Sequence, residues 1–237
     1  MRNQLNGNLS ITDLPGMERS ALATFPPEAQ PLLFAEVMSR SQQAVAAEGW
    51  STLGSTRRTA ALHEASHAVV WQITTCDRLP PPAEVVIHEE KSPPEEVGET
   101  WLGYITPKLG NYLGQYADPR DHPMLYALGM RHISGLVGEH LFNPADARRA
   151  SSLDEVVAAQ VVALNIALHS GLDVETAYAQ ITSRTATLLR ANEKVVLAIA
   201  DRLEQKLLLD ESELQKLLRR VKRPAGIQPR LAKGAIL

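Results

Sequence analysis

An otherwise apolar stretch, residues 60–71 (AALHEASHAVVW), carries two histidines and a glutamate. A stretch this apolar predicts a helix inside the core, and a helix places His63 and His67, four positions apart, on the same face. Burying the charge of Glu64 in such a helix is expensive unless a metal ion or a charged partner offsets it. The chain must therefore fold around a core helix that carries polar chemistry.

The His63-Glu64-Ala65-Ser66-His67 segment has the H-E-x-x-H spacing of a zinc hydrolase. Two imidazoles on one helix face can bind one Zn²⁺, and an open tetrahedral site needs one further protein ligand and a water. Glu64 lies close enough to serve as the general base that activates the zinc-bound water. The alternative is a pair of hydrogen-bonded core histidines beside an exposed glutamate.

The third ligand must come from a distant part of the chain. In the extended pattern a third histidine follows His67 by six residues, but position 73 is Ile73. The ligand must be a distant carboxylate or histidine, and the spacing along the chain admits five such residues: Glu139, Asp146, Asp154, His132 and His140.

Periodicity and turn residues predict an α+β chain that is mainly helical, with a small sheet beside the HExxH helix. An extended arm is expected at 1–27, and a basic, disordered tail at 219–237. Two strands, separated by an acidic loop at 89–99, are expected at 83–88 and 100–106. Helices are expected at 27–49, 56–74, 121–142, 152–169, 174–189, 191–209 and 212–218, the last capped by Ser212.

Composition narrows the class of protein. The 237 residues carry 24 Lys+Arg against 27 Asp+Glu, a formal net charge of −3, which gives no electrostatic reason to expect nucleic-acid binding. Cys76 is the single cysteine, so no internal disulfide is expected. Neither an export signal nor a membrane-spanning stretch is evident, and we expect a soluble cytoplasmic protein without an integral membrane segment.

Several segments, in order, resemble the FtsH-type zinc peptidases, the protease half of membrane-bound AAA+ proteases. Residues 63–70 (HEASHAVV) are similar to the family's HEAGHAVV signature. The resemblance spans about residues 56–218. It continues through VVIH (85–88), LGYITP (102–107), SGLVGEHLF (134–142), RASSLDEVVAA (149–159) and AIADRLEQKLLLDESELQKLL (198–218).

The resemblance implies a zincin-like peptidase domain, at 28–218, with one zinc per chain. The family's third ligand is the Asp of its G-A-S-x-D segment, which falls on Asp154, while Glu139 is the runner-up and is expected as a second-shell or structural carboxylate. The strand at 102–107 would be an edge strand to which a polypeptide substrate adds. A homo-oligomer is also implied, because the family assembles rings.

The chain also departs from the family. Residues 49–55 lack the lysine of a phosphate-binding loop, and with 62 residues before His63 we expect no ATPase domain like that of the family. A separate ATPase would then have to deliver folded substrates. Ser66 replaces a glycine of the signature, and Arg149 replaces the glycine of the G-A-S-x-D segment.

These features predict a zinc-dependent metalloendopeptidase that hydrolyses unfolded or loosely folded polypeptides, without an ATPase of its own. The alternative is a non-catalytic, zinc-stabilised module that binds peptides or supports assembly. Retention of Glu64 argues against it, because a structural zinc needs no base. An amidase acting on small molecules is a third option.

Overall fold

The computed structural model describes residues 27–28, 30–47, 55–76, 79–91, 100–108, 121–147 and 153–223. Nearly all of the arm expected at 1–27, most of the acidic loop and the chain beyond residue 223 lie outside these ranges. The described elements are α2 (Gln30–Ala47), α3 (Arg57–Ile73), β1 (Pro82–Glu89), β2 (Trp101–Pro107), α4 (His122–Phe142), α5 (Leu153–Ser170), α6 (Val174–Ala191), α7 (Glu193–Lys206), β3 (Leu208–Leu209) and α8 (Glu211–Leu218).

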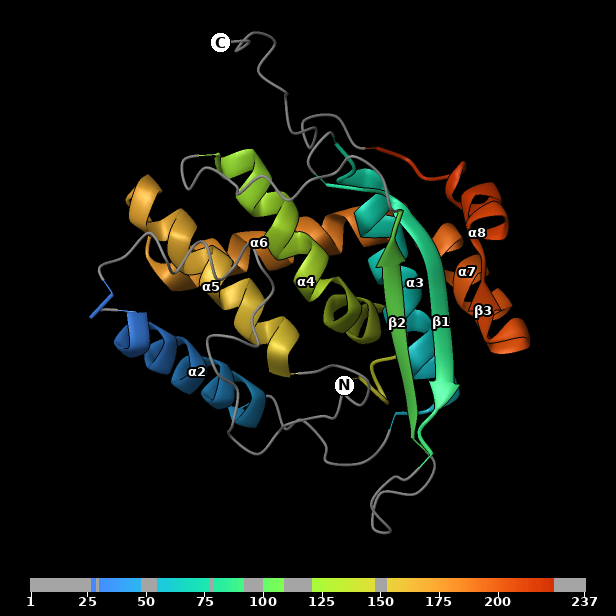
Figure 1. The fold of residues 1–237 in the computed structure, drawn as a ribbon, viewed down its shortest axis with the longest axis horizontal. Coiled ribbons are helices and arrows are strands. Elements are labelled where there is room, and N and C mark those ends of the chain that lie inside the picture. Colours follow the sequence, from blue (N-terminus) through green and yellow to red (C-terminus); the bar gives the residue numbers. More distant parts are fainter. Residues whose placement is uncertain are drawn as a thin grey trace, which may run out of the picture.

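Helix α3 lies at the centre of the molecule, as its apolar sequence predicts. It packs against the helices α4 and α7 and also against the two long strands, β1 and β2 (Figure 1). The side chain of Thr56 caps its first turn by accepting a hydrogen bond from the backbone N–H of Thr59. The expected mainly helical α+β class with a small sheet is confirmed, and α3 is its core helix.

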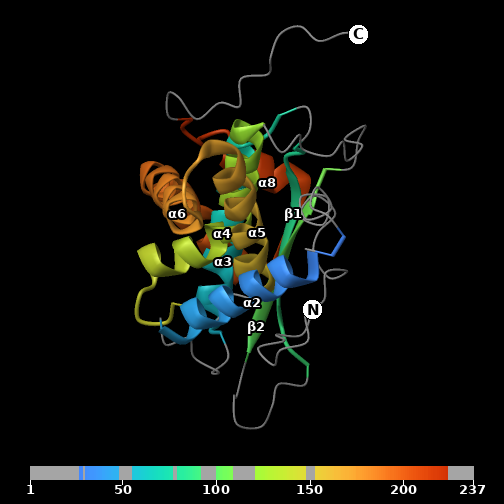
Figure 2. The ribbon, with the colours of Figure 1, turned by 90° about the vertical axis from the view of Figure 1, so that its left-hand side faces the viewer.

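The sheet is antiparallel, in the order β2-β1-β3, and lies beside α3 (Figures 1 and 2). Val85 and Ile87 of β1 are buried, and they pair with Ile105 and Gly103 of β2. Because side chains alternate along a strand, this register turns Gly103 toward the helices. Strand β2, at the sheet edge, is thereby placed next to the HExxH segment.

The single helix expected at 191–209 is wrong at its C-terminal end. Helix α7 ends at Lys206, because Leu207 adopts a left-handed conformation with φ of 66°. The next two residues form β3, which pairs with β1. The N-cap of α8 is Asp210, whose side chain accepts from the N–H of Glu213, and the predicted cap Ser212 already lies within the helix.

A second, smaller core joins α2 to α5. It consists of Phe34, Val37 and Met38 of α2 with Val157 and Val161 of α5. Because α5 also packs against α4, this cluster gives α5 a second set of contacts and helps to fix where the helix lies.

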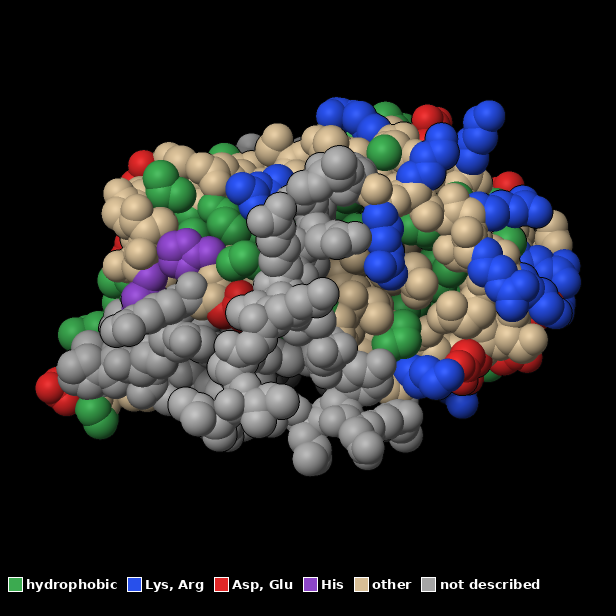
Figure 3. Space-filling view, turned by 90° about the horizontal axis from the view of Figure 1, so that it is seen from above, with side chains coloured by type: hydrophobic (Ala, Val, Ile, Leu, Met, Phe, Trp, Pro, Cys, Tyr) green, Lys and Arg blue, Asp and Glu red, His purple; other side chains and the backbone are tan. Residues whose placement is uncertain are grey.

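Two further properties of the described residues are the length of their apolar helices and the distribution of their basic side chains. No single helix among them is long and apolar enough to cross a membrane. Only α5 and α6 taken together have the length and composition of a membrane span, and they are bent by 118°. Basic side chains gather at the end of the molecule formed by α7 and α8 (Figure 3). The chain directly after α8 carries the exposed residues Arg219, Arg220, Lys222 and Arg223.

Candidate metal centre

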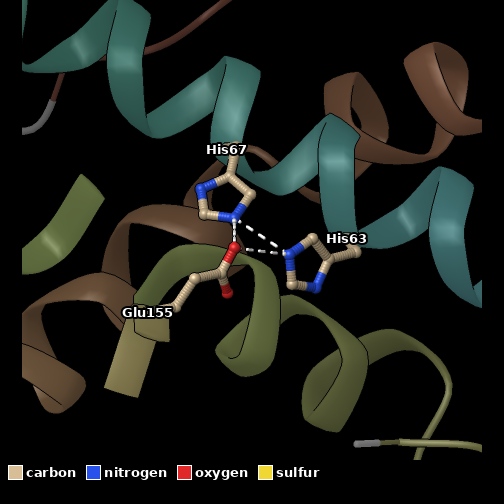
Figure 4. Close-up of side chains that lie close together, drawn as sticks. All are labelled: His63, His67 and Glu155. Carbon is tan, nitrogen blue, oxygen red and sulfur yellow. Dashed lines mark hydrogen bonds and ion pairs between the residues drawn. The ribbon is translucent and has the colours of Figure 1, made fainter. Parts of the chain in front are cut away.

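Helix α3 brings the two histidines together as the spacing predicts. The Nε2 atoms of His63 and His67 lie 3.0 Å apart, and both side chains are almost fully buried (Figure 4). Two imidazole nitrogens that approach this closely need a proton or a cation between them, because lone pairs repel each other. The pair is thus arranged to share either one proton or one cation.

A carboxylate from the start of α5 completes the group. Oε1 of Glu155 lies 3.1 Å from Nε2 of His63 and 3.2 Å from Nε2 of His67. The other oxygen, Oε2, is buried and has no hydrogen-bond partner among the described residues. Donor atoms of a tetrahedral zinc site lie about 3.3 Å apart, since Zn–N distances are about 2.0 to 2.1 Å. His63, His67 and Glu155 therefore form a group that could hold a metal ion.

The outer ring nitrogens are each held by an oxygen atom. Nδ1 of His63 lies 2.6 Å from Oε1 of Glu139, whose side chain is completely buried. Nδ1 of His67 lies 2.8 Å from the carbonyl oxygen of Arg131 and 2.9 Å from Oγ of Ser134. An oxygen acceptor at Nδ1 favours the tautomer with the proton there, which leaves the lone pair on Nε2. Both lone pairs then point at the shared position.

Charge coupling shifts the pKa values of the group. Burial alone would lower the pKa of His63, but the carboxylates of Glu155 and Glu139 outweigh burial and raise that pKa well above its ordinary value. Burial alone would raise the pKa of Glu155, but His63 and His67 outweigh it and hold that pKa well below its ordinary value. Without a metal ion, these shifts favour a protonated His63 beside the ionised carboxylate of Glu155.

Glu64 lies beneath β2. Its side chain is 5% exposed, and burial raises its pKa even though the two histidines act in the opposite direction. A Cβ atom built on Gly103 of β2 would lie 2.3 Å from Cγ of Glu64 and 2.6 Å from its Oε1. A side chain at this position would have to displace Glu64, so the backbone of β2 lies directly over the carboxylate.

The five candidates for the third ligand have different outcomes. Asp154 lies in α5, but its side chain is outside the described residues, so its role stays a prediction. Among the described side chains, the group that could hold a metal contains none of the other four: Glu139, Asp146, His132 and His140. Of these, Glu139 lies with Oε1 2.6 Å from Nδ1 of His63, so it contacts the outer nitrogen of a candidate ligand.

Glu155 is the residue that the sequence reasoning missed. It directly follows Asp154 in the first turn of a predicted helix, where both acidic residues are explained by the helix dipole alone. The available signal was weak: two adjacent carboxylates at a helix start point in directions about 100° apart, so at most one faces a given neighbour. The orientation of α5 had to be known to choose between them.

No protein-family model matches the chain, and no curated protein matches it. The resemblance to the FtsH-type peptidases therefore stays a prediction carried by the ordered motifs. The geometry shows two buried imidazoles and the partly exposed carboxylate of Glu155 close enough to hold a metal ion, with the buried carboxylate of Glu64 on the same helix as the imidazoles.

Proposed function

We propose that this protein is a zinc-dependent endopeptidase that hydrolyses peptide bonds of unfolded or loosely folded polypeptides. The observation that carries the proposal is the meeting of His63, His67 and Glu155 within 3.0 to 3.2 Å of one another, with Glu64 on the same helix. Two imidazoles and one carboxylate are the ligand set of several catalytic zinc sites, and three protein ligands leave one position open.

Zinc, when bound, would supply a Lewis acid that makes a water acidic and polarises a carbonyl. Glu64 is the residue we assign to take the proton from that water and to return it to the leaving amine. Its raised pKa suits both halves of this task, because a carboxyl group titrating closer to neutrality accepts and releases a proton more readily.

The sheet edge supports a polypeptide as the substrate. Strand β2 is the edge strand, and its Gly103 lies over Glu64. An extended peptide can add to an edge strand through backbone hydrogen bonds, and addition here would bring its peptide bonds next to the site. Folded chains cannot pair in this way, so substrates would be loosely folded or delivered by a separate unfoldase. Assembly into a homo-oligomer belongs to the same proposal.

The proposal is tested with Glu64→Gln, which keeps the size of the side chain but removes the base. Elemental analysis should find one zinc per chain in both proteins, and only the wild type should cleave an unfolded casein-like substrate. Glu193→Gln, an exposed carboxylate in the first turn of α7, is the matched control and should cleave normally.

Other outcomes identify the competing functions. Cleavage that survives Glu64→Gln would remove the proposed base. Zinc binding by a wild type that hydrolyses nothing would favour the non-catalytic peptide-binding or assembly module. Hydrolysis of small amides but never of peptides would favour the amidase.

A further inference from the structure

Arg131 of α4 contacts α3, the helix of the two histidines, in two ways: through its side chain and through its backbone carbonyl. Its guanidinium donates from Nε to Oγ1 of Thr74 at 2.8 Å, and from Nη2 to the carbonyls of Trp71 at 3.1 Å and Pro80 at 3.0 Å. These acceptors lie at the C-terminal end of α3 and in the connection to β1. Arg131 itself belongs to α4 and is only 6% exposed.

The cation of Arg131 stabilises the C-terminal end of α3, where the hydroxyl of Thr75 also donates to the carbonyl of Trp71. The last carbonyls of a helix lack intrahelical partners and carry partial negative charge, and α3 has no basic residue in its own last turn. The guanidinium also stacks over the ring of Trp71, 4.9 Å from its centroid. Burial lowers the pKa of Arg131 to about 9, so the group stays protonated at neutral pH. Its partners among the described residues are neutral, and they are concentrated on α3.

The backbone of the same residue contacts a proposed metal ligand. The carbonyl oxygen of Arg131 lies 2.8 Å from Nδ1 of His67, and Ser134 donates to that carbonyl at 2.9 Å. His67 lies on α3, one turn before Trp71. The two helices are thus closed into a loop of contacts: His67 to the carbonyl of Arg131, and the guanidinium of Arg131 back to the end of the His67 helix.

We infer that Arg131 is the positioning residue for His67, fixing the distance and direction between the His67 ring and the carbonyl that selects its tautomer. The part of this inference that concerns metal affinity rests on the proposed function. The contacts by which Arg131 would position His67 do not depend on catalysis. Anchoring α4 to the end of α3 prevents the two helices from sliding, so the Nδ1–H to carbonyl hydrogen bond keeps its geometry and the Nε2 lone pair its direction.

The experiment compares Arg131→Met with the wild type, using Arg184→Met as the matched control. Arg184 also lies over an aromatic ring, that of Tyr126 at 3.9 Å, but it is exposed and on α6. Competition titration should show zinc binding about tenfold weaker in Arg131→Met. The visible spectrum of the Co²⁺-loaded protein should change in intensity and position, while both readouts should stay as in the wild type for Arg184→Met.

Two gentler variants keep the test decisive if Arg131→Met does not fold. Arg131→Lys retains the cation and should recover part of the zinc affinity. Thr74→Val removes the acceptor of Nε, together with the bonds that the hydroxyl donates to the carbonyls of Val70 and Trp71, and leaves the guanidinium in place. It should weaken zinc binding about threefold with the same direction of spectral change. Folded variants that bind zinc within twofold of the wild type and give its Co²⁺ spectrum would overturn the inference.

A metal-free readout separates this inference from the proposed function. In ¹⁵N NMR of the metal-free protein at pH 8, His67 should carry its proton on Nδ1 in the wild type and show a mixture of tautomers in Arg131→Met or Thr74→Val. An unchanged single tautomer in these variants would refute the positioning role even if the wild type binds no zinc. Absence of zinc or of cleavage in the wild type would instead refute the proposed function.

Discussion

Gly135 of α4 lies directly against the imidazole of His63: a Cβ atom built on Gly135 would be 2.2 Å from both Cε1 and Nε2 of that ring. Such a distance is far inside van der Waals contact, so the ring occupies the space where any other residue would place its side chain. The approach of α4 to α3 therefore depends on a glycine at this position.

Gly135→Ala should displace the His63 ring and weaken zinc binding by about tenfold or more, since the ligand can no longer meet His67 and Glu155. Zinc titration of the purified variant measures this. Gly129→Ala is the control, because the same substitution on the same helix would meet Cδ1 of Ile181, at 2.7 Å, and no ligand. Equal zinc affinity in the two variants would contradict the prediction.

Ser66 and Gly138 form a size-matched pair. A Cβ atom on Gly138 would lie 1.9 Å from Oγ of Ser66, whose hydroxyl donates to the carbonyl of Leu62 at 2.7 Å. Gly138→Ala should lower the free energy of unfolding by about 1 to 3 kcal/mol through overpacking. Adding Ser66→Gly removes the clash, so the double variant should be more stable than the sum of the single effects by a similar amount. Denaturant unfolding of all four proteins measures this coupling, and strict additivity would argue against it.

Glu155 and Asp154 can be distinguished by paired substitutions. Glu155→Gln removes a charge that lies within 3.2 Å of both histidines, and zinc affinity should fall by about 100-fold or more. Asp154→Asn, one position earlier in the same helical turn, should leave zinc affinity within a few fold of the wild type. The reverse ranking in the same titration would restore Asp154 as the ligand.

The stability of the metal-free protein should fall as pH rises above neutrality. The raised pKa of His63 means that its protonated form stabilises the fold fully below about pH 6.5, a contribution lost as pH rises through the raised value. The lowered pKa of Glu155 stabilises the fold above about pH 4.5 and is lost as pH falls through the lowered value. The pKa of Glu64 is raised too, so its contribution to the stability of the fold also falls as pH rises.

Zinc should have the opposite pH dependence, because it displaces the proton that His63 holds. The increase in Tm on adding zinc is therefore expected to be larger at pH 8.5 than at pH 5.5, as measured by thermal unfolding with and without the metal. Glu155→Gln should show little zinc effect at either pH. A larger zinc effect at the lower pH would show that no protonated ligand competes with the metal.

Local sequence signals predicted most of the elements. Helix α3 was expected at 56–74 and runs from Arg57 to Ile73, because its apolar pattern and its cap at Thr56 are properties of neighbouring residues. The strands were located within a residue or two for the same reason. Leu207–Leu209 was missed, because the apolar pattern of α7 continues through it and its strand pairing is with Val85 and Val86, far away in the chain.

The sequence by itself determined that His63, Glu64 and His67 share one buried helix, because helical spacing places them without reference to the rest of the fold. Only the tertiary structure decided what completes the group. Glu155, 88 residues after His67, reaches the Nε2 atoms because α5 packs between α4 and α2 in one particular rotation. Adjacent residues of a helix differ by about 100° in direction, so that rotation, which depends on packing across the whole core, decides which face of α5 meets the histidines.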